Sequence, residues 1–129
     1  MNNKILIIDD EPALLAALAD KFTRVGFKTI VAENGREGLK SALKNRPNII
    51  LLDIIMPVMD GISMLYRLRK DPWGRKVKVI LLTNLSDPGK ITKVVTQKVN
   101  GYLVKSDWKI EDVVRQVKKK LKGKCAKQM

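Results

Sequence analysis

Short apolar runs recur along this chain, separated by segments in which polar and apolar residues are mixed. The runs at 5–8, 49–52, 79–82 and 102–104 are almost continuously apolar. Such runs are typical of parallel strands whose two faces are both covered by helices. A fifth run, at 29–32, has a thinner apolar content that suits a strand at the edge of a sheet. The pattern therefore predicts five strands.

The segments between the runs place apolar residues three or four positions apart, which is the spacing of an amphipathic helix. They predict five helices, around residues 14–25, 39–43, 62–68, 91–95 and 110–121. Pro12 suits the opening turn of the first helix, and Asp60 suits the N-cap of the third. Asp87 and Pro88 open the fourth helix in the same way.

Strands that alternate with helices predict right-handed crossovers and a single parallel sheet. The fold class is therefore α/β, a doubly wound five-stranded parallel sheet of the form (βα)5. At 129 residues the chain is long enough for one domain with one core. We assign this domain to residues 1–122 and a basic C-terminal tail to residues 123–129.

Composition excludes several classes of protein. Hydrophobic residues make up 45% of the chain and charged residues 30%, which is typical of a soluble globular domain. No apolar run approaches the ~18–20 residues that cross a bilayer, and the N-terminus lacks the pattern of a secretory signal. The single cysteine, Cys125, cannot form an internal disulfide, so we expect a cytoplasmic protein. The absence of histidine excludes Ser-His-Asp and Cys-His nucleophiles and the commoner zinc sites.

The formal net charge is +13, and about half of this excess lies near the C-terminus. Residues 115–129 hold seven basic residues and no acidic one, whereas residues 1–114 hold 19 basic and 13 acidic ones. A charge run of this kind is most often a solvated helix end with favourable dipole placement. The less favoured interpretation is attraction to nucleic acid, anionic lipid or an acidic partner. For nucleic acid, no recognisable motif accompanies the charge, and few aromatics are present to stack on bases.

Polar side chains follow all five predicted strands. Those after the second strand, in the segment Glu33-Asn34-Gly35, we interpret as part of a turn. Asp9, Asp10 and Glu11 follow the first, Asp53 the third, Thr83 the fourth and Lys105 the fifth. One aspartate after a strand is usually a turn or cap residue. In a doubly wound sheet, however, ligands bind at the carboxyl ends of the strands, so all of these side chains are expected at one edge.

Carboxylates that lie close together repel one another unless a cation sits among them. Oxygen ligands without histidine favour Mg²⁺, which also recruits phosphate oxygens. A metal, a lysine and a hydroxyl together can hold the oxygens of a phosphoryl group during its transfer. A carboxylate beside the metal can then act as the nucleophile and form an acyl phosphate.

Segments 7–12, 51–61, 81–83 and 101–106 resemble the marker segments of bacterial response-regulator receiver domains. The likeness extends over nearly the whole chain, from about Lys4 to Leu121. It implies a flavodoxin-like strand order of 2-1-3-4-5. It also implies a signalling switch rather than a metabolic enzyme, a switch that catalyses only its own phosphorylation and dephosphorylation. Its partners would be a sensor histidine kinase or a histidine phosphotransfer protein, and an unknown downstream protein.

The resemblance assigns the metal site and the acceptor residue by position. Asp53 would accept the phosphoryl group from a phosphohistidine. Asp10, Asp53 and the backbone carbonyl of Ile55 would ligate Mg²⁺, and Asp9 would contribute mostly through water.

The resemblance also assigns the residues that respond to phosphorylation. Lys105 would pair with the phosphoryl oxygens, and Thr83 would hydrogen-bond to one of them. Tyr102 occupies the position of the family's switch aromatic, although a partly buried strand tyrosine is an equally good interpretation. The loop at 56–61 would shape the rim of the pocket, with Gly61 supplying a positive φ.

Three alternatives remain beside a phosphorylated receiver. A Mg²⁺-dependent aspartyl phosphatase usually carries a second aspartate two residues after its nucleophile, where this chain has Ile55. A pseudo-receiver that serves only as a scaffold is disfavoured because Asp10, Asp53, Thr83 and Lys105 are all present. The third alternative is a basic nucleic-acid-binding module.

Overall fold

The structure is a computed structural model that describes residues 3–54, 56, 58–83, 99–105 and 109–126, with the backbone alone for residues 123–126. The helix predicted around residues 91–95 and the backbone carbonyl of Ile55 lie outside the described residues. Every other predicted helix and strand falls within them.

A five-stranded sheet forms the centre of the domain, and its strands are in the order β2-β1-β3-β4-β5. All four neighbouring pairs are parallel. The strands are β1 (Lys4–Ile8), β2 (Lys28–Ala32), β3 (Ile49–Asp53), β4 (Lys78–Thr83) and β5 (Gly101–Val104). This arrangement confirms the predicted fold class and strand order, including the position of β2 at an edge.

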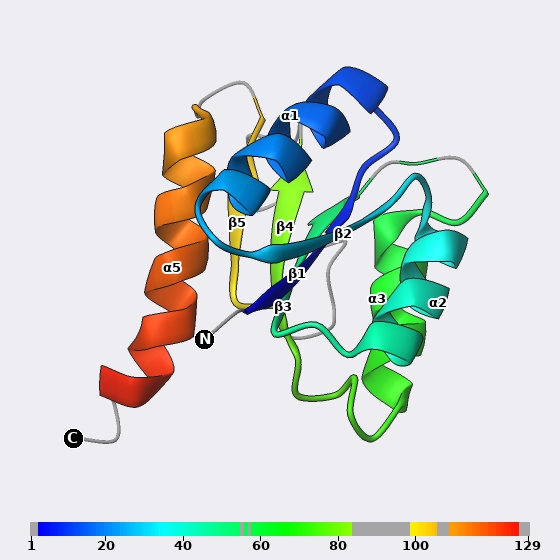
Figure 1. The fold of residues 1–129 in the computed structure, drawn as a ribbon. Coiled ribbons are helices and arrows are strands. Elements are labelled where there is room, and N and C mark those ends of the chain that lie inside the picture. The colour runs from blue at the N-terminus through cyan, green and yellow to red at the C-terminus, as the bar shows by residue number, and fades with distance from the viewer. Residues whose placement is uncertain (1–2, 55, 57, 84–98, 106–108, 127–129) are drawn as a thin grey trace.

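Four described helices cover the sheet on both faces (Figure 1). They are α1 (Pro12–Arg24), α2 (Gly35–Asn45), α3 (Gly61–Lys70) and α5 (Ile110–Ala126). Helices α1 and α5 lie on one face, whereas α2 and α3 lie on the other. Because each helix runs back against its strands, the helices begin near the carboxyl ends of the strands and end near their amino ends. We call these two sides of the sheet the carboxyl edge and the amino edge.

The sheet has a core on each face, and the alternation of side chains along β1 shows how they divide. Ile5 and Ile7 are buried against α1 and α5, whereas Leu6 and Ile8 are buried against α2 and α3. All four side chains are 0% exposed. Burying a side chain of this size contributes about 1.5–3 kcal/mol relative to leaving it in water. The near-continuous apolar runs are therefore the residues that both helical layers cover.

The helix starts follow the local signals in the sequence. Pro12 stands in the first turn of α1, and the Asp60 side chain accepts a hydrogen bond from Ser63 N at 2.8 Å. Asn34, which reads as part of a turn in the sequence, is the N-cap of α2 and accepts from Glu37 N at 2.8 Å. A capping side chain of this type typically contributes ~1 kcal/mol to helix stability.

Helix α5 continues to Ala126, so it includes the first residues of the segment assigned to the tail. The division of the chain at residue 122 remains a prediction. Glu111 and Asp112 lie in the first turn of α5, where the helix dipole favours acidic side chains. None of the helices that the structure describes is long and apolar enough to span a membrane.

Candidate functional site

The register of the sheet brings the ends of four strands together. β1 and β3 are paired as far as Ile8 and Leu52, so the residues that follow, Asp9 and Asp53, emerge side by side at the carboxyl edge. β4 lies next to β3 and ends at Thr83. The Thr83 carbonyl accepts a hydrogen bond from Lys105 N at 2.7 Å, just past the end of β5.

The alternation of side chains determines which of these residues face one another. In β1, β3 and β5, the residue two positions before each site residue packs in the core beside α1 and α5. Side chains two positions apart in a strand point to the same face of the sheet. Asp9, Asp53 and Lys105 therefore leave their strands toward the α1 and α5 side.

Three carboxylates meet at this edge. Asp9, Asp10 and Asp53 each place a carboxylate oxygen within 4.8 Å of the others. Asp9 is 0% exposed and Asp53 is 4% exposed, whereas Asp10 faces the solvent. Asp9 Oδ1 accepts a hydrogen bond from Glu11 N at 2.9 Å. The predicted acidic cluster is thus formed in the structure, with two of its members removed from water.

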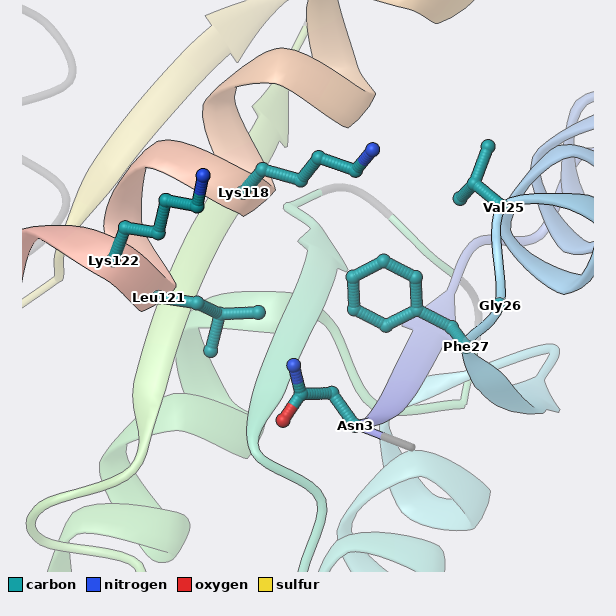
Figure 2. Close-up of a pocket in the computed structure, with 7 residues that line it drawn as sticks. All are labelled: Asn3, Val25, Gly26, Phe27, Lys118, Leu121 and Lys122. Atoms are coloured by element: carbon teal, nitrogen blue, oxygen red, sulfur yellow. The ribbon is translucent and has the colours of Figure 1, made fainter. Parts of the chain in front are cut away.

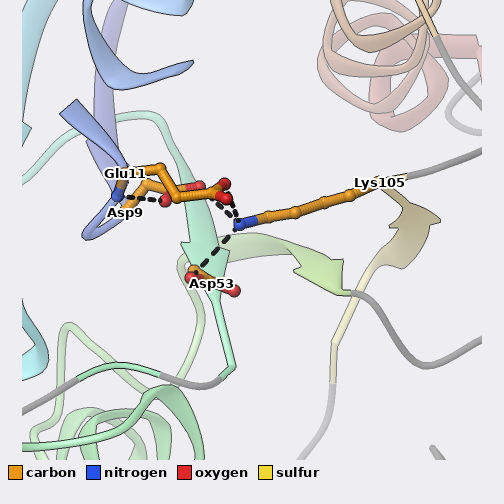
Figure 3. A network of polar contacts seen from close by, with 4 residues as sticks. All are labelled: Asp9, Glu11, Asp53 and Lys105. Carbon is orange, nitrogen blue, oxygen red and sulfur yellow. Dashed lines mark hydrogen bonds and ion pairs between the residues drawn. The ribbon is translucent and has the colours of Figure 1, made fainter. Parts of the chain in front are cut away.

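The Lys105 ammonium group lies among these carboxylates (Figure 3). Its Nζ is 2.9 Å from Asp9 Oδ2, 3.1 Å from Glu11 Oε2 and 3.2 Å from Asp53 Oδ2. The lysine side chain is 8% exposed, so most of its charge is neutralised by these contacts rather than by water. One ammonium faces more carboxylates than it can balance.

Burial and this excess of negative charge change the acidity of Asp53. Burial raises the pKa of Asp53 from 3.8 to about 7, with the Lys105 charge opposing the shift and Asp9 adding to it. Burial by itself would lower the pKa of Lys105, but its contacts with Asp9 and Glu11 and the charge of Asp53 outweigh this and raise it. Near neutral pH the lysine is therefore charged, and Asp53 is present partly as the neutral acid and partly as the carboxylate.

The donor set fits a hard divalent cation. Every side-chain ligand available in the cluster is a carboxylate oxygen, which Mg²⁺ prefers. Asp9 Oδ2 is buried and receives no aligned hydrogen bond from the described residues, although Lys105 Nζ lies 2.9 Å away. Asp9 and Asp53 share this one ammonium group, and a cation or its bound water would balance the remaining negative charge of their buried oxygens. The residues present are suited to hold Mg²⁺.

Gly61, the first residue of α3, packs against the backbone of Asp53. Its N–H donates to Ile54 O at 2.7 Å, and a Cβ at this position would collide with the Asp53 carbonyl oxygen. The positive φ expected at Gly61 is wrong. Among the described residues, the glycine with a positive φ is Gly26, and within the loop at 56–61 the positive φ, of 70°, occurs at Val58. Gly61 is needed for close approach rather than for an unusual backbone angle, and it holds the loop against the strand that carries Asp53.

The remaining predicted residues have different environments. Thr83 is 1% exposed at the end of β4, next to the strand of Asp53. Tyr102 is paired with Leu81 and is 38% exposed. Ile55 lies outside the described residues. The structure thus brings together Asp9, Asp10, Asp53 and Lys105, and it leaves the switch role of Tyr102 as a prediction.

Glu11 is a site residue to which the sequence alone gives no separate role. Its carboxylate contacts Lys105 Nζ at 3.1 Å, yet its side chain remains 56% exposed. The sequence signal is the third consecutive acidic residue after a buried strand. That signal does not reveal the partner, because Lys105 is distant in the sequence and only the sheet brings the two together.

Comparison with known proteins yields one family. Residues 5–118 match the model of the response regulator receiver domain. An uncharacterized transcriptional regulatory protein of Bacillus subtilis is 34% identical over 123 residues, covering 94% of this chain and 60% of the relative. The chain spans about half the length of the curated relatives it matches.

Solved structures of similar domains agree with this match. A response regulator receiver domain from Francisella superposes with a TM-score of 0.85 at 30% identity, covering 95% of this chain and 99% of that chain. The receiver domain of a sensor histidine kinase from Pseudomonas aeruginosa has a TM-score of 0.84 at 26% identity, covering 94% of this chain and 98% of that chain. In that crystal structure a magnesium ion is coordinated in the active-site cleft.

Proposed function

Because this chain belongs to the family of response regulator receiver domains, we propose that it is a phosphorylation switch in which Asp53 is the acceptor. The phosphoryl group would come from a phosphohistidine on a sensor histidine kinase or a histidine phosphotransfer protein. Phosphorylation would then change the affinity for a downstream protein. The chain acts as a signalling switch and not as a metabolic enzyme, and we place this switch in the cytoplasm.

The position of the Asp53 carboxylate carries this proposal. It is buried at the end of a central strand, 3.2 Å from an ammonium group and within 4.8 Å of two further carboxylates. A structural carboxylate would be expected to have its negative charge balanced. Asp53 instead has a pKa raised to about 7, which is the kind of perturbation that clusters at functional sites.

The transfer step exchanges one bond to phosphorus for another. An Asp53 carboxylate oxygen attacks the phosphorus, and the bond between phosphorus and the donor's imidazole nitrogen breaks. The electron pair of that bond returns to the imidazole. Lys105 is near enough to stabilise the negative charge of the transferring oxygens, and it remains protonated because its pKa is raised. Thr83 would hydrogen-bond to the phosphorylated aspartate, and Tyr102 would respond to that contact.

Mg²⁺ would be held by Asp10, Asp53 and the backbone carbonyl of Ile55, with Asp9 acting mostly through water. When bound, the cation supplies positive charge for the phosphoryl oxygens. The fit of the buried Asp9 and Asp53 oxygens to a hard cation supports this assignment. Asp53 must lose its proton before it can ligate the metal or attack phosphorus, so a raised pKa couples both events to pH.

The test is the intact mass of the protein after incubation with Mg²⁺ and acetyl phosphate. We expect a gain of one phosphoryl group, which Asp53→Asn and an excess of chelator both abolish. Asp60→Asn is the matched control, because Asp60 lies near the same edge and asparagine also caps helices. The control should be phosphorylated as the wild type is. Undiminished labelling of Asp53→Asn would overturn the proposal.

A further inference from the structure

Two adjoining hollows open at the amino edge of the sheet, on the opposite side from Asp53. The first lies between α5 and the turn that precedes β2, and Figure 2 shows its lining residues. The second extends from there past the start of β3 to the turn between α3 and β4. Their volumes are about 260 Å³ and 580 Å³, and they share Asn3, Leu121 and Lys122. We call them together the amino-edge groove.

The groove carries positive charge alone. Lys118 and Lys122 come from one face of α5 at its rim, and both are exposed. Arg46 and Lys76 are exposed at the other end. No acidic residue lines either hollow, and none of these four cations forms an ion pair within the part of the chain that the structure describes. An anion in the groove would therefore meet cations from both ends.

Between these cations the groove has an apolar surface. Phe27 and Leu121 face each other across the first hollow (Figure 2). Trp73 and Val77 line the second hollow. Gly26 leaves further room, since a Cβ there would meet nothing within 4 Å. A ligand that fills the groove needs an apolar group as well as negative charge.

We propose that the amino-edge groove binds an acidic peptide segment of a partner protein, anchored by an apolar side chain of that segment. The charged ends match acidic side chains, and the apolar hollow between them accepts the anchor. A nucleic acid strand fits less well, because stacking along a strand needs several free aromatic faces, and the described lining offers one half-buried ring, that of Trp73. Phe27 is 9% exposed, and its ring packs edge-on against Phe22 at 5.2 Å between centroids.

This surface is separate from the phosphoacceptor site. The strands between the two edges are five or six residues long, which corresponds to roughly 17–20 Å. A partner bound in the groove would leave the carboxyl edge open to a phosphodonor. The inference therefore goes beyond the proposed phosphorylation switch and does not depend on it.

The test measures binding of a fluorescein-labelled, glutamate-rich peptide with leucine at its centre, by fluorescence anisotropy at low ionic strength. Replacing Lys118 and Lys122 with glutamine should weaken binding about five- to twentyfold. The matched control replaces Arg36 and Lys40 with glutamine, since these are also exposed, four residues apart and on a helix, but away from the groove. The control should weaken binding less than about twofold. Equal losses in both variants would show a non-specific charge effect and would overturn the proposal.

Two further probes test the identity of the ligand. The same peptide with serine in place of leucine should bind more weakly, because the apolar hollow loses its anchor. Equal binding of the two peptides would overturn the proposal. A single-stranded oligonucleotide that binds more tightly than the leucine peptide, with the same sensitivity to the Lys118 and Lys122 replacements, would assign the groove to nucleic acid instead. Thermal melting of each variant verifies that it is folded, and phosphorylation of Asp53 should be unchanged.

Discussion

The two edges of the sheet use charge in opposite ways. At the amino edge, buried or half-buried cations donate hydrogen bonds to backbone carbonyls of the helices. Lys4 Nζ donates to Asn45 O and Lys78 Nζ donates to Lys120 O. At the carboxyl edge, the buried charges are carboxylates that face one another, with Lys105 as the one described cation in contact with them. The buried or half-buried cations of the amino edge thus have carbonyl partners, whereas the buried carboxylates of the carboxyl edge outnumber the cation that they contact.

The arrangement of parallel strands and returning helices explains part of this difference. Helices end at the amino edge, where the negative end of each dipole favours basic side chains, and they begin at the carboxyl edge, where acidic ones are favoured. Arg67, Arg69 and Lys70 in the last turn of α3 follow this rule. Burial of Asp9 and Asp53 side by side goes beyond it, because no helix dipole requires two buried carboxylates in contact. This excess of buried negative charge, which the fold does not need, supports the function proposed for the carboxyl edge.

Removing a buried cation from the amino edge should have the largest effect on the stability of the protein, and it tests whether these cations hold that edge together. Arg69 is 9% exposed, and its Nη1 donates to Gly74 O and Val77 O, both at 2.7 Å. Arg69→Leu leaves these carbonyls without their charged donor and should lower the free energy of unfolding by about 2–4 kcal/mol. Urea denaturation measures this loss.

The matched control is Arg67→Leu, on the same helix but exposed. Its effect should be within about 0.5 kcal/mol of zero, as is usual for surface substitutions. A change for Arg69→Leu as small as that of the control would mean that water replaces the guanidinium without loss. The amino edge would then not be held together by its buried cations.

The opposite effect is expected at the carboxyl edge, where Asp53→Asn should stabilise the metal-free protein. Burial raises the pKa of Asp53 from 3.8 to about 7, so the folded state retains a proton that the unfolded state loses between about pH 4 and pH 7. Stability of the wild type therefore falls as the pH rises through this window. Asparagine does not titrate, so its advantage should grow through the window and reach about 1–3 kcal/mol at pH 8.

Thermal or urea denaturation in the presence of chelator, at pH 4 and at pH 8, measures this difference. Asp60→Asn, the same substitution at an exposed helix N-cap, is the control for the effect of the amide itself. If Asp53→Asn were less stable than the wild type at pH 8, the carboxylate would be a structural ion-pair partner of Lys105. The two edges would then not differ in the way proposed.

The sequence predicts the parts of this molecule whose signals are local. The strands are buried on both faces, so their apolar runs are visible without knowledge of the fold. Asp60 caps α3 because its side chain bonds to a backbone group three residues away. The position of Asp9 and Asp53 at one edge follows from where their strands end. Each of these features is encoded within a few residues.

Features that depend on distant residues were not predictable in the same way. The contact between Glu11 and Lys105 requires the register of β5 relative to β1. Glycine is needed at position 61 because a Cβ there would collide with the backbone of Asp53, whereas the sequence predicted a positive φ as the reason. The role of Arg69 depends on how the chain turns between α3 and β4. Periodicity and turn preferences carry no information on these contacts.

A smaller effect should appear in the pH dependence of metal binding at the carboxyl edge. Mg²⁺ competes with the proton on Asp53, whose pKa is raised to about 7. Affinity should therefore increase as the pH rises, by about tenfold between pH 6 and pH 8, and level off above that. Calorimetric titration at several pH values measures the change. Asp53→Asn should lose this dependence, and an equally steep one in the variant would assign it to another group.

The smallest expected effect is a change in Mg²⁺ affinity that depends on where the Lys105 ammonium moves when the metal binds. In the metal-free protein its ammonium contacts Asp9, Asp53 and Glu11. A divalent cation among the aspartates repels the ammonium, and the exposed Glu11 is the remaining carboxylate contact toward which it can shift. Glu11→Gln weakens that alternative, so Mg²⁺ affinity should fall about two- to fivefold. Lys105→Met removes the competing charge, so the affinity should stay the same or rise.

A double-mutant cycle separates this role of Glu11 from a direct attraction between its charge and the metal. If Glu11 acts through Lys105, Glu11→Gln should have little effect in the Lys105→Met background, because no ammonium is left to accommodate. If Glu11 attracts the cation directly, the same two- to fivefold loss should occur in both backgrounds. Titration of the four proteins with Mg²⁺ decides between the two. It is made well above pH 8, because removal of the Lys105 charge, which lowers the pKa of Asp53, raises that pKa further in the Lys105→Met proteins. An undiminished loss in the Lys105→Met background would show that Glu11 belongs to the metal site itself, and that the excess negative charge of the carboxyl edge extends to its exposed rim.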